Sequence, residues 1–560
     1  MMMKRPVFKS LMSAMGIILM LSTALAAAPT DNRHAKRNPA TPRVGKHDSS
    51  VDNRIRRHKA SQGNSDRVRV IIRAAAGRRA RLGVLLNSVG GHRFKAEHGL
   101  INAITVEVPV AALSAIEASP LVDSISLDAD LAANQIGVTT PPSYLLRPAL
   151  GLTMASPQGA GVGVAILDSG IYPSSDFENR ITAFYDFTHG GKATAPYDDY
   201  GHGTHVAGLV GGNGARSNGV YAGVAPRVYL IGMKVLDRTG SGTTSNVISA
   251  LQFATVNKEA LGIDVINLSL GHVIFESAAT DPMVQAVQQA AAAGIVVVVS
   301  AGNMGVSPAT GLPGYGGILS PANAPSAITI GSVNLEDTTR RSDDRINNFS
   351  SRGPSWYDTF VKPDLVAPGY KLVGPAAPGS TLAVNYASLL VDGSPTAPAA
   401  YITLNGTSMA AAVASGVAAL AIEANRNAFA TSRPPLSPSA IKSIMEFTSV
   451  KLIDPATGQP YDALTQGSGG LNGQGVIALS GAIDTGAVGG PMVAGPVTPF
   501  TAIDDENLSW SENILWGENI LWGENILWGE NILWGENILW GENILWGENI
   551  LWGENILWGE

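Results

Sequence analysis

The sequence predicts an α/β protein with a doubly wound parallel sheet, preceded by a small α+β domain and followed by a repetitive tail. Between about residues 162 and 485, short apolar segments alternate with helical stretches. These segments are apolar on both faces, which is typical of buried parallel strands covered by helices. A shorter series of strands and helices precedes them, and one hexapeptide is repeated at the end of the chain.

The chain begins with a pattern typical of a secretory signal peptide over residues 1–28. Lys4, Arg5 and Lys9 precede an apolar run that ends in small residues. The run is shorter than the roughly 20 residues that a membrane span needs, so cleavage near residues 26–28 is favoured over an uncleaved anchor. Residues 29–66 are polar, basic and without apolar periodicity, which predicts an exposed linker.

Residues 67–135 form the small predicted domain. Alternating apolar residues predict strands over 68–74, 101–109 and 122–130, and helices over 79–91 and 110–119. The expected order is therefore β-α-β-α-β. Such a small domain is either removed from the mature protein or, as the alternative, retained in it permanently.

Residues 136–485 form the predicted main domain. Its strands are expected over 163–167, 228–236, 263–270 and 295–303, with helices after His202, over 245–257 and over 281–294. In such sheets, active residues gather beyond the carboxyl ends of the strands. Residues 486–505, rich in Gly, Pro and Val, predict a linker.

Residues 506–560 form the repetitive tail, in which ENLSWS at Glu506 is followed by eight identical ENILWG units from Glu512 to Gly559. Nine of the ten tryptophans lie here. A period of six fits a strand better than a helix. Two interpretations of the tail are equally supported. It is either a segment that associates with a surface, a polymer or its own copies, or a recently expanded repeat with little selected role.

Composition excludes several kinds of chemistry. The 560 residues contain no cysteine, so disulfides, thiolate catalysis and cysteine-bound zinc are ruled out. The net charge of −7 hides a basic region between residues 33 and 95. That region has no interleaved aromatic residues and no recognisable module, so we do not expect a nucleic-acid partner.

Three short motifs carry the predicted chemistry. In VAILDSG, Asp168 ends a strand; in DDYGHGTHVAG, His202 begins a helix; in LNGTSMAAAVASG, Ser408 follows a turn at a helix N-terminus. Nucleophilic catalysis by serine needs a hydroxyl, a base to take its proton and a carboxylate to orient that base. The order Asp, His, Ser along the chain is that of subtilisin and differs from the orders of other serine hydrolases.

These motifs resemble those of the subtilases, over roughly residues 162–485. The resemblance implies that Asp168 orients the imidazole, that His202 is the general base and then the general acid, and that Ser408 is the nucleophile. It further implies that Asn303 in VVVVSAGN joins the Ser408 backbone amide as the oxyanion hole. Residues 67–135 resemble the inhibitory prosegment of the family.

The resemblance also implies a substrate cleft with two walls that pair with an extended peptide through the main chain. The implied wall residues are Gly240, Ser241 and Gly242 on one side and Ser269, Leu270 and Gly271 on the other. The chemistry requires no cofactor. Structural calcium is common in the family, but its ligands cannot be assigned from this sequence.

Neighbouring residues have competing interpretations. His205, one helical turn beyond His202, is interpreted as a packed structural histidine rather than a second base. Asp198 and Asp199 could bind calcium, although solvated turn carboxylates are commoner.

The sequence therefore predicts an exported serine endopeptidase. It would be made as a zymogen that cleaves its own prosegment near residues 130–145. Its expected location is secreted or extracytoplasmic, with surface association through the tail as an option. Its partners would be peptide substrates and its own prosegment as an intramolecular inhibitor. The alternatives are a pseudoprotease that only binds, and an adhesive protein whose tail is the main function.

Overall fold

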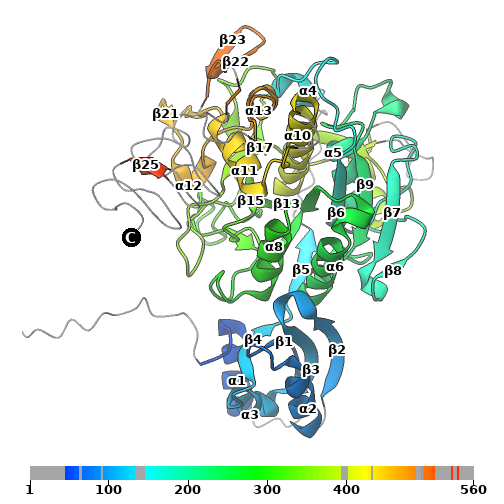
Figure 1. Ribbon diagram of the computed structural model, residues 1–560, viewed down its shortest axis with the longest axis vertical. Helices are drawn as coiled ribbons and strands as arrows, with labels where there is room; N and C mark the ends of the chain where they lie inside the picture. The colour runs from blue at the N-terminus through cyan, green and yellow to red at the C-terminus, as the bar shows by residue number, and fades with distance from the viewer. Residues whose placement is uncertain are drawn as a thin grey trace, which may run out of the picture. The chain divides into compact units, whose positions relative to one another are not determined.

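The computed structural model describes residues 45–61, 66–89, 92–133, 145–391, 401–429, 433–486, 493–494, 496–510, 531–533 and 539–541. The predicted signal peptide, most of the repeat tail and residues 134–144 lie outside these ranges. Figure 1 shows the chain coloured from its N-terminus to its C-terminus.

Residues 45–133, here called the N-terminal module, form a four-stranded antiparallel sheet in the order β2-β3-β1-β4. Its elements are α1 Ser49–Ser61, β1 Arg67–Ala74, α2 Arg79–Val89, β2 Arg93–His98, β3 Ala103–Pro109, α3 Leu113–Glu117, β4 Val122–Leu127 and β5 Asp130–Ala133. Strand β2 was not predicted, because its side chains are largely exposed and charged and lack apolar alternation.

The segment predicted as an exposed linker differs from that prediction over its second half. Residues 49–61 form helix α1, and Val51 and Ile55 are buried against the sheet of the N-terminal module. Ahead of the helix, His47 pairs with Ile125 of the edge strand β4. Two apolar residues four apart in a strongly polar stretch were too weak a signal for a helix.

The main sheet has nine strands, in the order β16-β15-β13-β11-β6-β9-β7-β8 with β17 beside β15, and it is parallel except for the short strands β8 and β16. This is the predicted doubly wound architecture. Its strands are β6 Gly163–Asp168, β7 Ile181–Asp186, β8 Lys192–Ala193, β9 Tyr229–Lys234, β11 Val265–Leu268, β13 Val296–Ser300, β15 Ile328–Asn334, β16 Arg345–Ile346 and β17 Leu365–Pro368.

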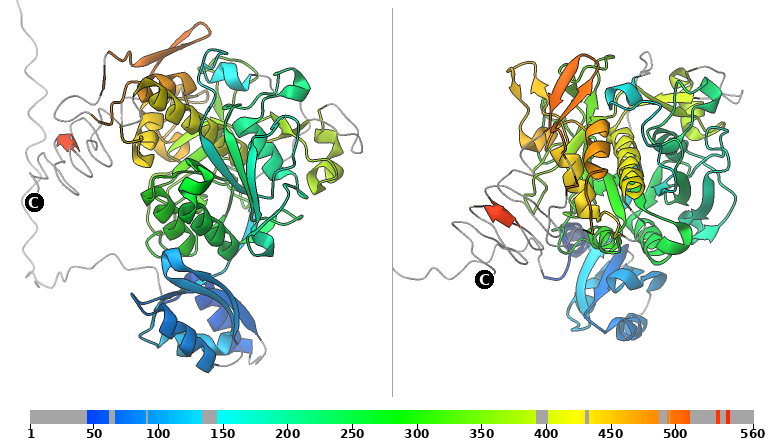
Figure 2. Two further views of the ribbon diagram at one scale, coloured as in Figure 1. Left: turned by 45° about the vertical axis from the view of Figure 1, so that its right-hand side comes forward. Right: turned by 45° about the horizontal axis from the view of Figure 1, so that its top comes forward.

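Helices cover both faces of the sheet, as the two views of Figure 2 show. In β6, Val164 and Ile166 pack with α5 and α10, whereas Ala165 and Leu167 pack with α6 and α8, so alternate side chains enter two separate cores. The helices of this domain are α4 Leu146–Ala149, α5 His202–Gly211, α6 Thr244–Val256, α7 Lys258–Leu261, α8 Pro282–Ala292, α9 Thr381–Asn385, α10 Thr407–Ala428, α11 Pro438–Phe447, α12 Ala463–Gln466 and α13 Gly473–Ser480.

Helix α10 is the one described helix that is long and apolar enough to cross a membrane, and its apolar 18-residue window is entirely buried. It is therefore the central core helix of the domain rather than a span.

Short strands complete the fold: β10 Ser241–Thr243, β12 Leu270–Val273, β14 Leu319–Ser320, β18 Leu372–Pro375, β19 Tyr401–Leu404, β20 Ile453–Asp454, β21 Gln459–Pro460, β22 Phe500–Ile503, β23 Glu506–Ser509, β24 Asn531–Leu533 and β25 Leu539–Gly541. The hairpin β22–β23 crosses the predicted boundary between linker and tail at residues 505 and 506. Trp510 beyond it is buried in the main core.

Candidate active site

Asp168 and His202 meet at the carboxyl end of the parallel sheet. Asp168 is the last residue of β6, and its Oδ1 lies 2.7 Å from Nδ1 of His202, the first residue of α5. Both side chains are fully buried. A Cβ on Gly203 would lie 2.2 Å from the Gly170 carbonyl oxygen, so only glycine allows the helix to approach the strand this closely.

Ser408 enters this group from the start of α10. Gly406 caps the helix with a φ of 150°, and Ser408 follows in its first turn, where helix amides favour negative charge. The Ser408 hydroxyl donates to the Ser269 carbonyl at 3.0 Å, and His202 Nε2 has no hydrogen-bond partner among the described residues. The Ser408 hydroxyl therefore bonds to the Ser269 carbonyl rather than to the imidazole of His202.

Asn303 faces the same helix N-terminus. Its Oδ1 accepts from the backbone N–H and the hydroxyl of Thr407, both at 3.0 Å. Its Nδ2 is buried and has no described partner. Thr407 thus fixes the orientation of the amide and leaves one N–H pair free to donate to an oxyanion.

Five of the six predicted wall residues flank strand β5 of the N-terminal module, which lies between β10 and β12. The sheet order is β10-β5-β12-β14, and β5 is antiparallel to both neighbours. Ala132 pairs with Ser241 and Gly271, Leu131 pairs with Gly242, and Ala133 pairs with Leu270. The Ala133 N–H donates to the Gly240 carbonyl at 3.1 Å.

Ser269 differs from the other wall residues. Its carbonyl accepts from the Ser408 hydroxyl, and its own hydroxyl donates to the Ser408 carbonyl at 3.0 Å. It therefore connects the cleft wall to the start of α10 rather than pairing with β5.

His205 and the two neighbouring aspartates have structural surroundings. Burial lowers the pKa of His205 to about 3, and its Nε2 lies 3.0 Å from the Leu372 carbonyl. The Asp198 carboxylate accepts from Ser169, from Thr204 and from the backbone of residues 200 and 201. These donors occupy the Asp198 carboxylate, and the Asp199 carboxylate accepts from Lys234 Nζ at 2.6 Å. The described residues hold no cluster of three or more His, Asp or Glu suited to a metal.

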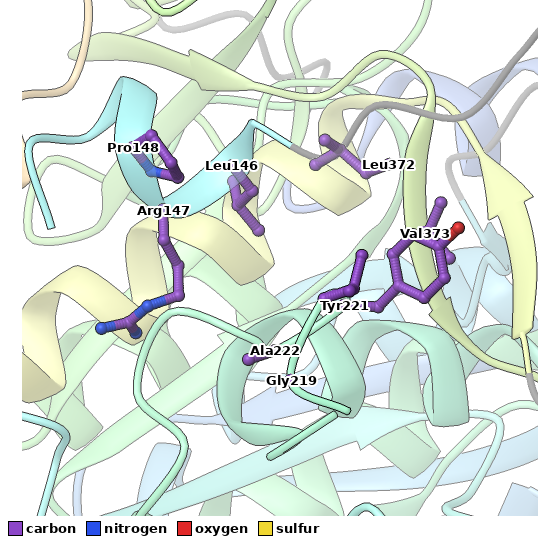
Figure 3. Close-up of a pocket in the computed structure, with 9 residues that line it drawn as sticks. Leu146, Arg147, Pro148, Gly219, Tyr221, Ala222, Leu372 and Val373 are labelled. Atoms are coloured by element: carbon purple, nitrogen blue, oxygen red, sulfur yellow. The ribbon is translucent and has the colours of Figure 1, made fainter. Parts of the chain in front are cut away.

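A separate pocket of about 210 Å³ lies between α4, residues 219–222 and the start of β18 (Figure 3). Its lining includes Leu146, Arg147, Tyr221 and Leu372 and none of the three residues Asp168, His202 and Ser408. It is therefore not the site of the predicted chemistry.

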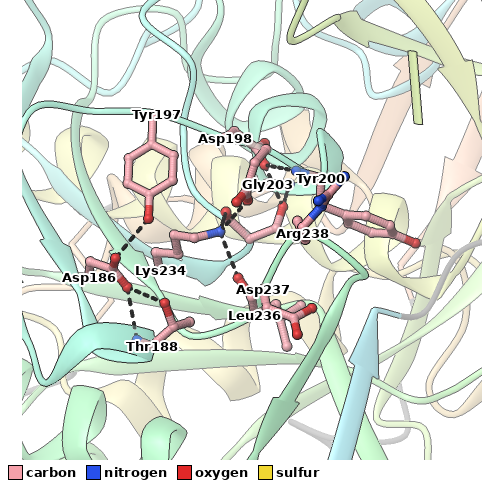
Figure 4. A network of polar contacts seen from close by, with 12 residues as sticks. Asp186, Thr188, Tyr197, Asp198, Tyr200, Gly203, Lys234, Leu236, Asp237 and Arg238 are labelled. Atoms are coloured by element: carbon pink, nitrogen blue, oxygen red, sulfur yellow. Dashed lines mark hydrogen bonds and ion pairs between the residues drawn. The ribbon is translucent and has the colours of Figure 1, made fainter. Parts of the chain in front are cut away.

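Sequence reasoning missed the polar groups that hold these residues. Ser169, Asp198 and Lys234 link the segments that carry Asp168 and His202 (Figure 4). A lysine inside the apolar stretch VYLIGMKVL was the one signal that could have pointed to this network.

Comparison with known proteins decides the family. Residues 159–474, more than half of the chain, match the Subtilase family. The chain belongs to the subtilases. It is 34% identical to subtilisin DY of Bacillus licheniformis over 297 residues, 53% of this chain and 86% of that protein. It is thereby a member of a serine protease family.

The longer relatives share only part of their length with this subtilase. Serine protease AprX of Bacillus subtilis (strain 168) is 39% identical over 293 residues, which cover 51% of this chain and 61% of that protein. Fervidolysin from Fervidobacterium pennivorans, described as a keratinolytic enzyme related to subtilisin, superposes with a TM-score of 0.56 at 19% identity over 78% of this chain and 63% of fervidolysin. That likeness supports the fold.

Proposed function

We propose that this subtilase is an exported serine endopeptidase that hydrolyses peptide bonds through an acyl-enzyme. Ser408 attacks the carbonyl carbon, His202 takes the hydroxyl proton and later gives it to the leaving amine, and Asp168 orients the imidazole. Water then hydrolyses the ester by the same base catalysis. The observation that carries this proposal is the 2.7 Å contact between Asp168 and His202 beside a serine at a helix N-terminus.

The tetrahedral oxyanion is stabilised by Asn303 together with the Ser408 backbone amide. Support comes from the buried Nδ2 of Asn303, which has no described partner while its Oδ1 is held by Thr407. A donor fixed in this way needs no reorganisation when charge develops.

Substrates bind as an extended strand between β10 and β12, through main-chain hydrogen bonds. Strand β5 occupies this cleft with a substrate-like register, which supports the proposal that the N-terminal module is an inhibitory prosegment. No cofactor takes part in the chemistry.

The register of β5 also supports the expected region of the cut. Ala133 pairs with Leu270, which directly follows Ser269, and Ser269 contacts Ser408. We therefore propose that the autocatalytic cut lies shortly after Ala133, within residues 130–145 as expected from the sequence. Residues 134–144 lie outside the described residues.

The decisive experiment is labelling of the purified, processed protein with a fluorophosphonate. We expect a covalent adduct on Ser408, an unprocessed chain for Ser408→Ala, and a new N-terminus of the wild type shortly after Ala133, within residues 130–145. Absence of the adduct under conditions where subtilisin DY reacts would sink the enzyme proposal. Normal self-cleavage of Ser408→Ala would sink autocatalysis alone.

A further inference from the structure

Lys234 is a buried cation that the reaction above does not use. Its side chain is 1% exposed, at the end of β9 beside β6. A buried ammonium is costly unless every proton finds an acceptor. Lys234 Nζ donates to the Ser169 carbonyl at 2.6 Å, to the Leu236 carbonyl at 2.8 Å and to the Asp199 carboxylate at 2.6 Å (Figure 4).

Each acceptor belongs to a segment that ends in the active site. Ser169 directly follows Asp168. Asp199 lies in the loop that leads into His202. Leu236 precedes the turn that becomes the cleft wall β10. One ammonium group therefore ties together three segments that are separate in the sequence.

Further hydrogen bonds connect the same segments. The Asp168 carbonyl accepts from the N–H groups of Val235 and Leu236. The Ser169 hydroxyl donates to Asp198 at 2.9 Å and accepts from the Gly203 N–H at 2.9 Å. Lys234 supplies the cation in this network, and its Nζ also lies 5.1 Å from the centre of the Tyr197 ring.

We propose that Lys234 is a positioning residue for peptide hydrolysis, which holds the Asp168–Ser169 turn, the loop before His202 and the wall β10 in one fixed arrangement. The inference rests on the proposed function. A hydrophobic residue of equal length would fill the space but leave the Ser169 and Leu236 carbonyls without this donor. The turn that carries Asp168 would then relax, and a shift of about 1 Å in a reacting group costs about 100-fold in rate.

The test compares Lys234→Met and Lys234→Arg with Lys258→Met. Lys258 is the control, because its Nζ also donates to a backbone carbonyl, that of Ala293, but it lies in α7, which contains no wall residue. For each processed enzyme, kcat and KM are measured on a peptide substrate, together with the thermal unfolding midpoint.

We expect Lys234→Met to lower kcat about 10- to 100-fold while KM changes less than about threefold. Lys234→Arg should recover part of the lost kcat. Lys258→Met should have the kcat and KM of the wild type. If Lys234→Met does not fold, Lys234→Gln, a shorter neutral donor, takes its place with the same expectation of lowered kcat. A kcat within about twofold of the wild type, or an equal loss in Lys258→Met, overturns the inference. Wild-type activity tests the proposed function separately, because the inference depends only on the ratio of variant to wild type.

Discussion

At the residue scale, the amide of Asn303 shows how a neighbour can fix the orientation of the proposed oxyanion donor. Thr407 occupies both lone pairs of Oδ1, so the amide cannot flip without losing two hydrogen bonds. Asn303→Leu keeps the volume and removes the donor, and we expect kcat to fall about 100- to 1000-fold with a smaller change in KM. Asn257→Leu, at the end of α6, is the control. Equal kinetics for the two variants would exclude Asn303 from oxyanion stabilisation.

His98 makes a second residue-scale prediction, on the pH dependence of the N-terminal module. Burial lowers the pKa of His98 to about 4, and its Nε2 lies 2.7 Å from the Thr105 hydroxyl. An unfolded histidine titrates near 6.5, so the unfolded state takes up a proton first as the pH falls. The contribution of His98 to the stability of the module is therefore greatest above pH 6.5 and falls by up to about 3 kcal/mol between pH 6.5 and 4.

Hydrogen exchange of residues 67–133 in the Ser408→Ala protein measures this loss. We expect exchange, corrected for its intrinsic pH dependence, to rise as the pH falls from 6.5 to 4, and we expect His98→Gln to flatten that rise. His92→Gln, a histidine outside the core of the module, is the control. The same pH dependence in His98→Gln and in the wild type would assign the loss to other groups.

The positions of Asp168, His202, Ser408 and Asn303 could be predicted because each lies in a short motif whose residue types are dictated by local geometry. The groups that hold them could not. Ser169 and Asp198 are 29 residues apart, and Lys234 and Asp199 are 35 residues apart. Such partners are brought together by the parallel sheet rather than by the neighbouring sequence. The rotamer of Ser408 likewise depends on Ser269, which is 139 residues away.

At the element scale, strand β5 is held in the cleft by main-chain pairing and by one apolar anchor. Leu131 is 2% exposed and packs in the core between the sheet and helices α6 and α8. Leu131→Ala should weaken the binding of the proposed prosegment to the main domain by about 2–5 kcal/mol, because a cavity replaces the buried side chain. We expect free protease activity to appear faster after processing, as followed with a peptide substrate.

The control for this variant is Val84→Ala, since Val84 of α2 is 70% exposed. If Leu131→Ala released activity no faster than Val84→Ala, the apolar anchor would contribute nothing to inhibition. The measurement starts from the purified precursor so that both variants begin in the same state.

The elements of the main sheet were predictable because strands apolar on both faces, such as β6 and β13, have few other structures open to them. Strand β2 and helix α1 were missed for the opposite reason. Strand β2 exposes most of its side chains, and the described side chains of α1 include only two buried apolar ones, Val51 and Ile55. Their conformations therefore depend on the sheet of the N-terminal module, to which β2 pairs through β3 and the segment before α1 pairs through β4. Tertiary contacts, rather than local pattern, stabilise these two elements.

At the scale of the whole molecule, the main domain extends beyond residue 485, where the sequence predicted its end. Hairpin β22–β23 crosses the predicted boundary between linker and tail, and Trp510, from the first and divergent hexapeptide, is buried against Phe447 in an edge-to-face contact. Its Nε1 donates to Thr501 at 2.7 Å. The first hexapeptide thus belongs to the main domain. Its position at the head of the repeat series concealed this in the sequence.

This boundary makes a prediction about truncation. A chain that ends at residue 511 keeps Leu508 and Trp510 and should unfold like the full chain, whereas a chain that ends at residue 505 loses both buried side chains. Loss of a buried tryptophan alone costs about 3–5 kcal/mol, so the shorter chain should unfold at a clearly lower temperature. Trp510→Ala in the chain that ends at 511 should reproduce most of the loss, while Trp356→Ala, at a 61% exposed position, should not.

Equal unfolding midpoints for the chains ending at 505 and 511 would show that the first hexapeptide belongs to the tail. If the two chains differ, studies of the remaining ENILWG units should start from the chain that ends at 511, because only that deletion leaves the enzyme's core intact.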